Sequence, residues 1–349
     1  MKIAIVQLNP TIADFKSQYD RMVADAKQAR DQGCDLVVFP ELVLCGYPPR
    51  DMLEQDTFVD ANEACLVKLI DQIHGIGVIC GLVTRNTDQQ GKALFNSAVL
   101  FEDGRLLYTV HKQLLPTYDV FDEQRHFEPG RANRPLPYKG LRLGLTICED
   151  AWNDKDIFHR QLYATDPVPQ LAADGMDLLI NIAASPFHKG KRNFRDRMLA
   201  NIARKHKVTV CFANQVGGND HILFDGASTV FNTSGEVVAR AADFNTDTIV
   251  YDTDTGAGDL RAACPSDTHA VLAALIMGTR DYVTKCGFKQ AVIGLSGGID
   301  SALTAYIATQ ALGPENVAAI FMPSRYTCRD NYEDTRALAE NIGVAYTDI

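Results

Sequence analysis

Three features are scarce in this sequence of 349 residues: long apolar runs, closely spaced cysteine pairs and an excess of positive charge. No run of about 18 apolar residues occurs, and the start MKIAIVQLNP lacks the basic and apolar regions of a secretory signal. We therefore expect neither a membrane span nor export. The formal net charge of -10 argues against a surface that binds nucleic acid or another polyanion.

The nine cysteines include no CxxC pair, and most of them lie in apolar runs. This pattern suits buried thiols in a reducing compartment better than a disulfide framework or a zinc site. We therefore expect a cytoplasmic protein.

The composition, 46% hydrophobic and 22% charged, is typical of a soluble globular protein, and the length favours two domains. Short runs such as KIAIVQL, GVICGLV and DLLINIAAS predict buried strands. Residues 15–32 and 194–206 have helical patterns between such runs, and this alternation predicts the α/β class. Residues 100–108 and 230–238 each predict a hairpin at the margin of a sheet.

The pattern changes after residue 250. Residues 251–267 are small, polar and aperiodic, which indicates a linker between a first domain over residues 1–250 and a second domain over residues 268–349. In the second domain a helix is followed by a strand, a glycine loop, another helix and another strand, which predicts a βαβ unit. Because this describes only a fragment of a parallel sheet, we expect the second domain to be incomplete.

Three chemically distinct side chains follow predicted strands. Cys148 ends the run LRLGLTIC, Glu41 follows DLVVFP, and Lys112 follows the strand that closes the first hairpin. The ends of buried strands are where sites form in α/β sheets. A carboxylate that takes the proton of the thiol, with an ammonium nearby, would activate the sulfur for attack on an amide carbonyl. Lys112 would then face the developing oxyanion.

The segments around these residues carry a resemblance. FPELVLCGYPPRD, HKQLLPTYDVFDEQRHF and GLTICEDAW resemble, in order and spacing, the Glu, Lys and Cys motifs of the nitrilase superfamily. The CEDAW form is similar to its NAD synthetase glutaminase branch. The resemblance covers residues 1–250 and implies an α-β-β-α sandwich. It also implies that Glu41 is the general base, Cys148 the nucleophile that forms a γ-glutamyl thioester, and Lys112 the group that stabilises the tetrahedral intermediate.

The same resemblance implies a site for glutamine. A free amino acid presents an ammonium that needs an acceptor and a carboxylate that needs a cation. Glu123 matches a further carboxylate found beside the triad, although a surface acid in DEQR is the alternative reading. The residues that match the glutamine-binding positions are Tyr118, Glu149, Ser185 and Lys191.

A glycine loop, GLSGGIDSA, follows an apolar strand and opens a helix, so its backbone N–H groups would surround an anion. It lacks the GK[ST] of a Walker A loop. It resembles the SGGxDS loop of N-type ATP pyrophosphatases, which implies ATP as substrate, Mg²⁺ held by Asp300, and no tightly bound prosthetic group. The residues assigned to ATP are Gly294, Leu295, Ser296, Gly297, Gly298, Ile299, Asp300 and Ser301.

The loop alone does not identify the product, because GMP, asparagine and argininosuccinate synthetases and tRNA thiolation enzymes resemble it too. A nitrilase-type glutaminase ahead of SGGIDS favours the NAD synthetases, and MPSRY at 322–326 resembles a segment of that family. The implied reaction uses L-glutamine, ATP and deamido-NAD, in a homo-oligomer. Two alternatives stay open: a stand-alone nitrilase or amidase that acts on another amide, and a non-catalytic scaffold subunit that binds nucleotide.

Overall fold

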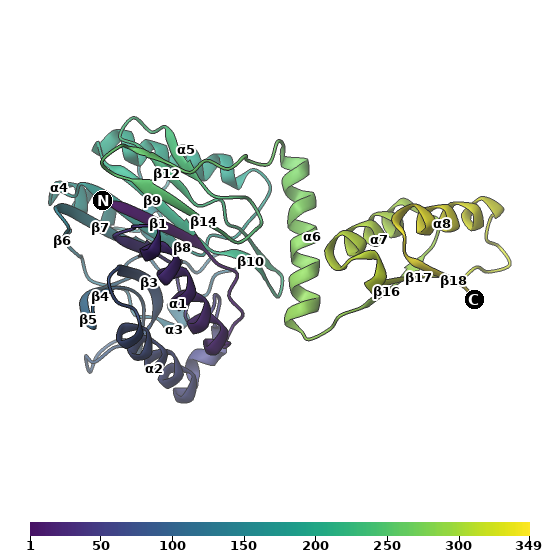
Figure 1. Ribbon diagram of the computed structural model, residues 1–349, viewed down its shortest axis with the longest axis horizontal. Coiled ribbons are helices and arrows are strands. Elements are labelled where there is room, and N and C mark those ends of the chain that lie inside the picture. Colours follow the sequence, from purple (N-terminus) through teal and green to yellow (C-terminus); the bar gives the residue numbers. More distant parts are fainter. The chain divides into compact units, whose positions relative to one another are not determined.

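The computed structural model describes residues 1–349, which divide into two compact units. The first unit comprises Met1–Gly217 and Ile222–Cys264, and the second comprises Gly218–His221 and Pro265–Ile349. Each unit has its own sheets and helices (Figure 1). None of the helices is long and apolar enough to cross a membrane.

The first unit contains two large sheets and part of a small hairpin, whose residues Gly218–His221 are assigned to the second unit. The seven-stranded sheet has the order β15-β14-β1-β2-β3-β4-β5 and the six-stranded sheet the order β13-β12-β9-β8-β7-β6. The strands of the first sheet are β1 (Lys2–Gln7), β2 (Leu36–Val38), β3 (Gly77–Arg85), β4 (Leu94–Glu102), β5 (Arg105–His111), β14 (Asp247–Asp252) and β15 (Ala257–Gly258). Those of the second are β6 (Leu136–Tyr138), β7 (Leu141–Ile147), β8 (Leu178–Ala183), β9 (Thr209–Asn214), β12 (Thr229–Phe231) and β13 (Val237–Arg240). The hairpin pairs β10 (Val216–Asn219) with β11 (Ile222–Asp225).

Helices cover the outer face of each sheet. Helices α1 and α2 pack on the first sheet, and α4 and α5 pack on the second (Figure 1). The helical segments are α1 (Phe15–Asp31), η1 (Arg50–Glu54), α2 (Asp56–Gln72), α3 (Glu123–His126), η2 (Cys148–Ala151), α4 (Pro167–Ala173) and α5 (Lys191–His206). The predicted α-β-β-α sandwich is confirmed.

The central strands are apolar on both faces because both faces are covered. In β1, Ile3 and Ile5 belong to the core between the two sheets, whereas Ala4 and Val6 belong to the core under α1 and α2. A strand that is buried on both sides has no reason to alternate apolar and polar residues. This explains why KIAIVQL and its counterparts are continuous apolar runs.

The directions of the strands bring the three candidate residues to matching edges. Strand β2 runs parallel to β3, β4 runs antiparallel to β3, and β5 runs antiparallel to β4. Strands β2 and β5 therefore end at the same edge of the first sheet. Glu41 lies just beyond the end of β2 and Lys112 just beyond the end of β5, while Cys148 lies just beyond β7 of the second sheet.

The two hairpins predicted at sheet margins are confirmed, because β5 and β13 are edge strands. The segment 251–267 differs from the expected linker in its first part. Strand β14 continues to Asp252, and Ala257–Gly258 pairs with it as β15. A short edge pair of this kind is held by backbone hydrogen bonds, so it leaves no apolar pattern in the sequence.

The second unit holds the predicted βαβ arrangement. Its strands form a parallel sheet in the order β16-β17-β18, with Leu295, Val317 and Ala305 in a small core that α7 and α8 complete. Its elements are α6 (Asp267–Lys285), β16 (Ala291–Leu295), α7 (Ile299–Leu312), η3 (Pro314–Asn316), β17 (Val317–Phe321), α8 (Arg329–Ile342) and β18 (Ala345–Asp348).

One glycine of β3 fixes the position of the segment that carries Glu41. A Cβ atom on Gly81 would lie 2.3 Å from the backbone nitrogen of Leu42 and 2.6 Å from Cα of Glu41. The N–H of Gly81 also donates to the carbonyl of Pro40 at 3.1 Å. The backbone beyond β2 can therefore lie directly against β3 only because position 81 has no side chain.

We predict that Gly81→Ala lowers the free energy of unfolding by about 2 kcal/mol, within the range for overpacking. Gly144→Ala in β7 is the matched control, since its Cβ would meet the sulfur of Met176 at 2.6 Å and that flexible side chain can move. Urea unfolding of both variants measures the difference. Equal costs would show that the backbone contact at Gly81 is not the constraint.

Candidate active site

Lys112 is a fully buried ammonium held between two carboxylates. Its Nζ donates to Oε1 of Glu41 and to Oε1 of Glu123, both at 2.7 Å, and the Lys112 residue is 1% exposed. Glu123 begins α3 and is 4% exposed, so it is not the surface acid that the alternative reading suggested. Buried charges are retained where they are paired and hydrogen-bonded.

Further hydrogen-bond donors satisfy the oxygens of the two carboxylates. Glu41 accepts from Nδ2 of Asn96 at 2.7 Å through Oε1 and from the N–H of Ala184 at 2.8 Å through Oε2. Glu123 accepts from the hydroxyl of Tyr47 at 2.8 Å. The cluster thus joins a residue of β4 to residues just beyond β2, β5 and β8, and every charge in it has several partners.

The cluster shifts the protonation of its members. Burial lowers the pKa of Lys112, but the carboxylates of Glu123 and Glu41 outweigh it and raise that pKa well above the usual value. Burial raises the pKa of Glu123 to about 7, with Lys112 opposing and Glu41 adding to the shift. Lys112 therefore keeps its positive charge, which the neighbouring carboxylates stabilise.

Cys148 stands at a sharp corner between β7 and the turn η2. Its φ of +44° lies in the left-handed region, which is uncommon for a residue with a side chain and often marks a functional position. The residue is 4% exposed. Burial and Glu41 raise the pKa of its thiol well above the usual value, with Lys112 opposing. The resting sulfur therefore carries its proton and needs a base to remove it.

Asp150 ties the loop of Lys112 to the corner of Cys148. Its Oδ1 accepts the N–H groups of Gln113 and Leu114 at 2.9 Å each, and its Oδ2 accepts the N–H of Ile147 at 3.0 Å. The carboxylate is 2% exposed. One side chain therefore sets the separation between the segments that carry the ammonium and the thiol.

The structure brings the expected glutamine-binding residues to the same region. The hydroxyl of Tyr118 donates to Oε1 of Glu149 at 2.8 Å. The backbone N–H of Ser185 donates to Oδ1 of Asn214 at 2.9 Å, while its hydroxyl is buried without a hydrogen-bond partner. Nζ of Lys191 lies 5.2 Å from the centroid of the Trp152 ring and forms no ion pair. Unpartnered polar groups of this kind are available to a ligand.

Three residues of the site were missed by sequence reasoning. Asn96 is a polar residue inside the apolar run LFNSAVL, and that interruption was a usable signal. Tyr47 lies in the matched segment CGYPP but was assigned no role. Tyr163, whose hydroxyl donates to Oε1 of Glu149 at 3.0 Å, comes from an irregular segment that carries no periodic signal.

The glycine loop of the second unit has the predicted strand, loop and helix setting. Gly297 has a φ of +83°, and Gly298 caps the N-terminus of α7. The hydroxyl of Ser296 accepts the N–H of Gly298 at 3.2 Å, and the hydroxyl of Ser301 accepts the N–H of Ser296 at 3.2 Å. Asp300 is exposed in the first turn of α7. The eight loop positions assigned to ATP are thus contiguous in space.

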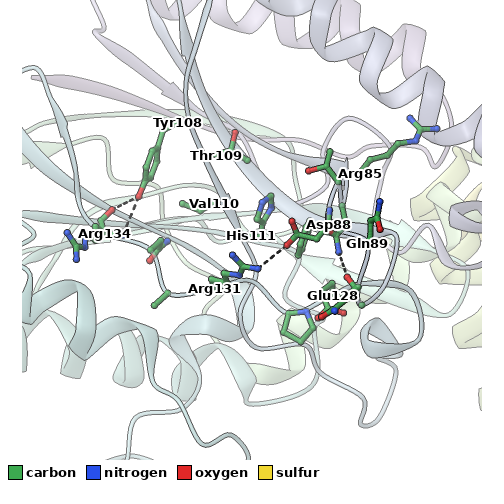
Figure 2. Close-up of a pocket in the computed structure, with 18 residues that line it drawn as sticks. Arg85, Asp88, Gln89, Tyr108, Thr109, Val110, His111, Glu128, Arg131 and Arg134 are labelled. Atoms are coloured by element: carbon green, nitrogen blue, oxygen red, sulfur yellow. Dashed lines mark hydrogen bonds and ion pairs between the residues drawn. The ribbon is translucent and has the colours of Figure 1, made fainter.

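A separate hollow of 1160 Å³ lies along β4, β5 and the loops 86–91 and 128–134 (Figure 2). None of the predicted site residues lines it. Two of its three arginines are already paired, Arg131 with Asp88 at 2.9 Å and Arg85 with Asp60 at 2.6 Å. It therefore has few free charges with which to bind a small ligand.

Comparison with known proteins agrees with this geometry. A carbon-nitrogen hydrolase profile matches residues 2–262 and an NAD synthase profile matches residues 271–349. The glutamine-dependent NAD(+) synthetase of Synechocystis sp. is 42% identical, over 98% of this chain and 63% of that protein. The corresponding protein of Thermotoga maritima is 35% identical, over 99% of this chain and 64% of that protein. The chain thus spans less than two thirds of these relatives.

Solved structures give the same result. The glutamine-dependent NAD+ synthetase of Acinetobacter baumannii, solved with ADP, matches with a TM-score of 0.89 and 34% identity, over 99% of this chain and 64% of that one. An amidase from Nesterenkonia sp. AN1, with acrylamide added at its active site cysteine, matches with a TM-score of 0.61 and 25% identity, over 72% and 92%. Because the first profile covers most of its length, this chain belongs to the carbon-nitrogen hydrolase family.

Proposed function

We propose that this chain is part of a glutamine-dependent NAD synthetase, in which the first unit hydrolyses glutamine and the second unit contributes to the ligation. The observation that carries the proposal is the buried Cys148 beside Glu41 and Lys112, in a chain whose later residues match NAD synthase. Relatives that match both parts along 98% or more of this chain are named as such synthetases.

The first half-reaction follows from the cluster. Glu41 takes the proton of the Cys148 thiol, and the sulfur attacks the side-chain amide carbon of glutamine. Lys112 stabilises the charge that develops on the amide oxygen, and its two carboxylates keep it in place. The proton held by Glu41 passes to the leaving nitrogen, so ammonia departs and a γ-glutamyl thioester remains. Water, with Glu41 again as base, then releases glutamate.

The second half-reaction activates the nicotinate carboxylate of deamido-NAD with ATP, giving an acyl-adenylate and pyrophosphate. Ammonia then attacks the acyl carbon, displaces AMP and forms the amide. The backbone N–H groups between Ser296 and Ser301, at the N-terminus of α7, would bind phosphate oxygens. Mg²⁺ fits this set because it takes one or two carboxylates together with phosphates and water, and Asp300 offers an exposed carboxylate. When bound, the ion would neutralise phosphate charge. The homo-oligomeric state and the cytoplasmic location stay predictions.

The stand-alone amidase is the second candidate, since the Nesterenkonia amidase shares the fold over 72% of this chain. The match of residues 271–349 to NAD synthase counts against it, because an amidase has no use for that unit. The scaffold alternative is weakened by the complete cluster around Cys148, since a buried ammonium and two carboxylates have no evident purpose in a subunit that only binds nucleotide.

Cys148→Ala should abolish glutamine-supported NAD formation and preserve ammonia-supported formation, because it removes only the nucleophile. The assay follows NAD in a protein that extends to the length of the relatives. Cys211→Ala, at a buried cysteine of β9, is the matched control and should retain both activities. A glutamine analogue that carries an electrophile should add its mass to the peptide containing Cys148. Loss of both nitrogen donors with the fold intact would contradict the assignment.

Asp150→Asn should lower glutamine hydrolysis by about ten- to a hundredfold, because a small displacement of reacting groups has effects of this size. An amide cannot accept the N–H groups of Gln113, Leu114 and Ile147 as the carboxylate does, so stability should also fall by roughly 1–3 kcal/mol. Asp177→Asn is the control, since this exposed carboxylate accepts the N–H of Arg142 at the other end of β7. Equal hydrolysis by the two variants would exclude a positioning role.

Asp300→Asn should reduce ammonia-supported synthesis and leave glutamine hydrolysis unchanged, because it removes a hard oxygen ligand in the second unit only. Glu315→Gln, at an exposed acid of η3 beyond the C-terminal end of α7, is the control. Both half-reactions are measured over a range of Mg²⁺ concentrations. If synthesis by Asp300→Asn matches that of the control at every concentration, Asp300 does not hold the metal.

A further inference from the structure

One oxygen of the Glu149 carboxylate accepts two hydrogen bonds, and the other oxygen accepts none. Its Oε1 accepts two phenol hydroxyls, that of Tyr118 at 2.8 Å and that of Tyr163 at 3.0 Å, whereas its Oε2 accepts no hydrogen bond. The residue is 3% exposed. Because buried polar atoms are normally hydrogen-bonded, this free oxygen can accept a hydrogen bond from a ligand.

A cation without a carboxylate partner lies in the same region. Lys191 begins α5, stacks over the ring of Trp152 and forms no ion pair. Burial lowers the pKa of Lys191, and Cys148, Asp225 and Glu149 lie close enough to oppose that shift. The thiol is therefore flanked by one open carboxylate and one unpaired ammonium. These two groups match the ammonium and the carboxylate of a free α-amino acid.

Hydrogen bonds to Asn153 hold the segment that contains Tyr163 beside the site. Nδ2 of Asn153, a residue that is 2% exposed, donates to the carbonyls of Tyr163 at 3.0 Å and Thr165 at 2.7 Å. The side chain of Gln161 donates back to the carbonyl of Asn153 at 3.3 Å. Although residues 154–166 have little regular structure, the phenol of Tyr163 is therefore held in a defined place.

We infer that Tyr163 is a positioning residue that makes the thiol site selective for amides bearing an α-ammonium group. With Tyr118 it occupies Oε1 of Glu149 and turns Oε2 toward the substrate ammonium, while Lys191 receives the substrate carboxylate. The inference rests on the proposed function and adds to it the group that distinguishes an amino acid amide from a simple amide. Burial raises the pKa of Glu149, and the two phenols oppose that shift because each donates to the charged carboxylate.

The test compares glutamine with glutaramate, which keeps the amide and the carboxylate but has hydrogen in place of the α-amino group. Tyr163→Phe should lower kcat/KM for glutamine by about tenfold, mainly through a higher KM, because hydrogen bonds to charged groups have effects of this order. Turnover of glutaramate should stay within about twofold, since it has no ammonium for Glu149 to bind. If Tyr163→Phe still turns over glutaramate, the thiol site of the variant is intact.

Tyr138→Phe is the matched control. Its hydroxyl donates to the carbonyl of Asp35 at 3.2 Å, at the opposite end of β2 from Glu41, so both substrates should be unaffected. If Tyr163→Phe lowers kcat/KM equally for both substrates, the role of Tyr163 is merely structural. If kcat/KM for glutamine is unchanged, the Tyr163 hydroxyl does not contribute to recognition of the ammonium. If the unsubstituted protein turns over glutaramate but not glutamine, the proposed function itself fails, whatever Tyr163→Phe does.

Discussion

The buried ammonium of Lys112 is the constraint on which the first unit depends. A charge in an apolar interior costs several kcal/mol unless it is paired and hydrogen-bonded, and removal of one partner from such a pair typically costs about 3–5 kcal/mol. Its two carboxylates are held in turn by further hydrogen-bond donors. One of these donors, the N–H of Ala184, lies just beyond β8 of the second sheet, so Glu41 is fully hydrogen-bonded only when the two sheets are stacked.

The thiol site of the first unit and the glycine loop of the second unit differ in exposure and in how their polar groups are paired. The thiol site is buried and its charged groups are already paired, which suits the neutral amide group of the proposed substrate, because that group's oxygen becomes charged only during the reaction. The glycine loop is exposed, and its serines bond to the loop itself through Ser296 and Ser301. A phosphate group would replace these internal bonds. An open loop of backbone donors suits a large anion that brings its own charge.

Much of this arrangement could be predicted from the sequence, for identifiable reasons. Strands buried on both faces leave continuous apolar runs, and the candidate residues follow such runs because parallel strands end at a common edge. The pairing of β14 with β15 could not be predicted, since backbone hydrogen bonds at a sheet edge place no demand on residue type. Tyr163 could not be predicted either, because its position depends on contacts of Asn153 within an aperiodic segment.

Burial alone does not make a cysteine reactive, as the other thiols of the first unit illustrate. Burial raises the pKa of Cys45, Cys80 and Cys211 as it does that of Cys148, so all four sulfurs are protonated at rest. What differs is the neighbourhood, because Cys148 alone of these four is influenced by a carboxylate and an ammonium together. In the proposed function Glu41 is the base that takes the proton of this thiol, so the reactivity of Cys148 depends on its charged neighbours and not on burial.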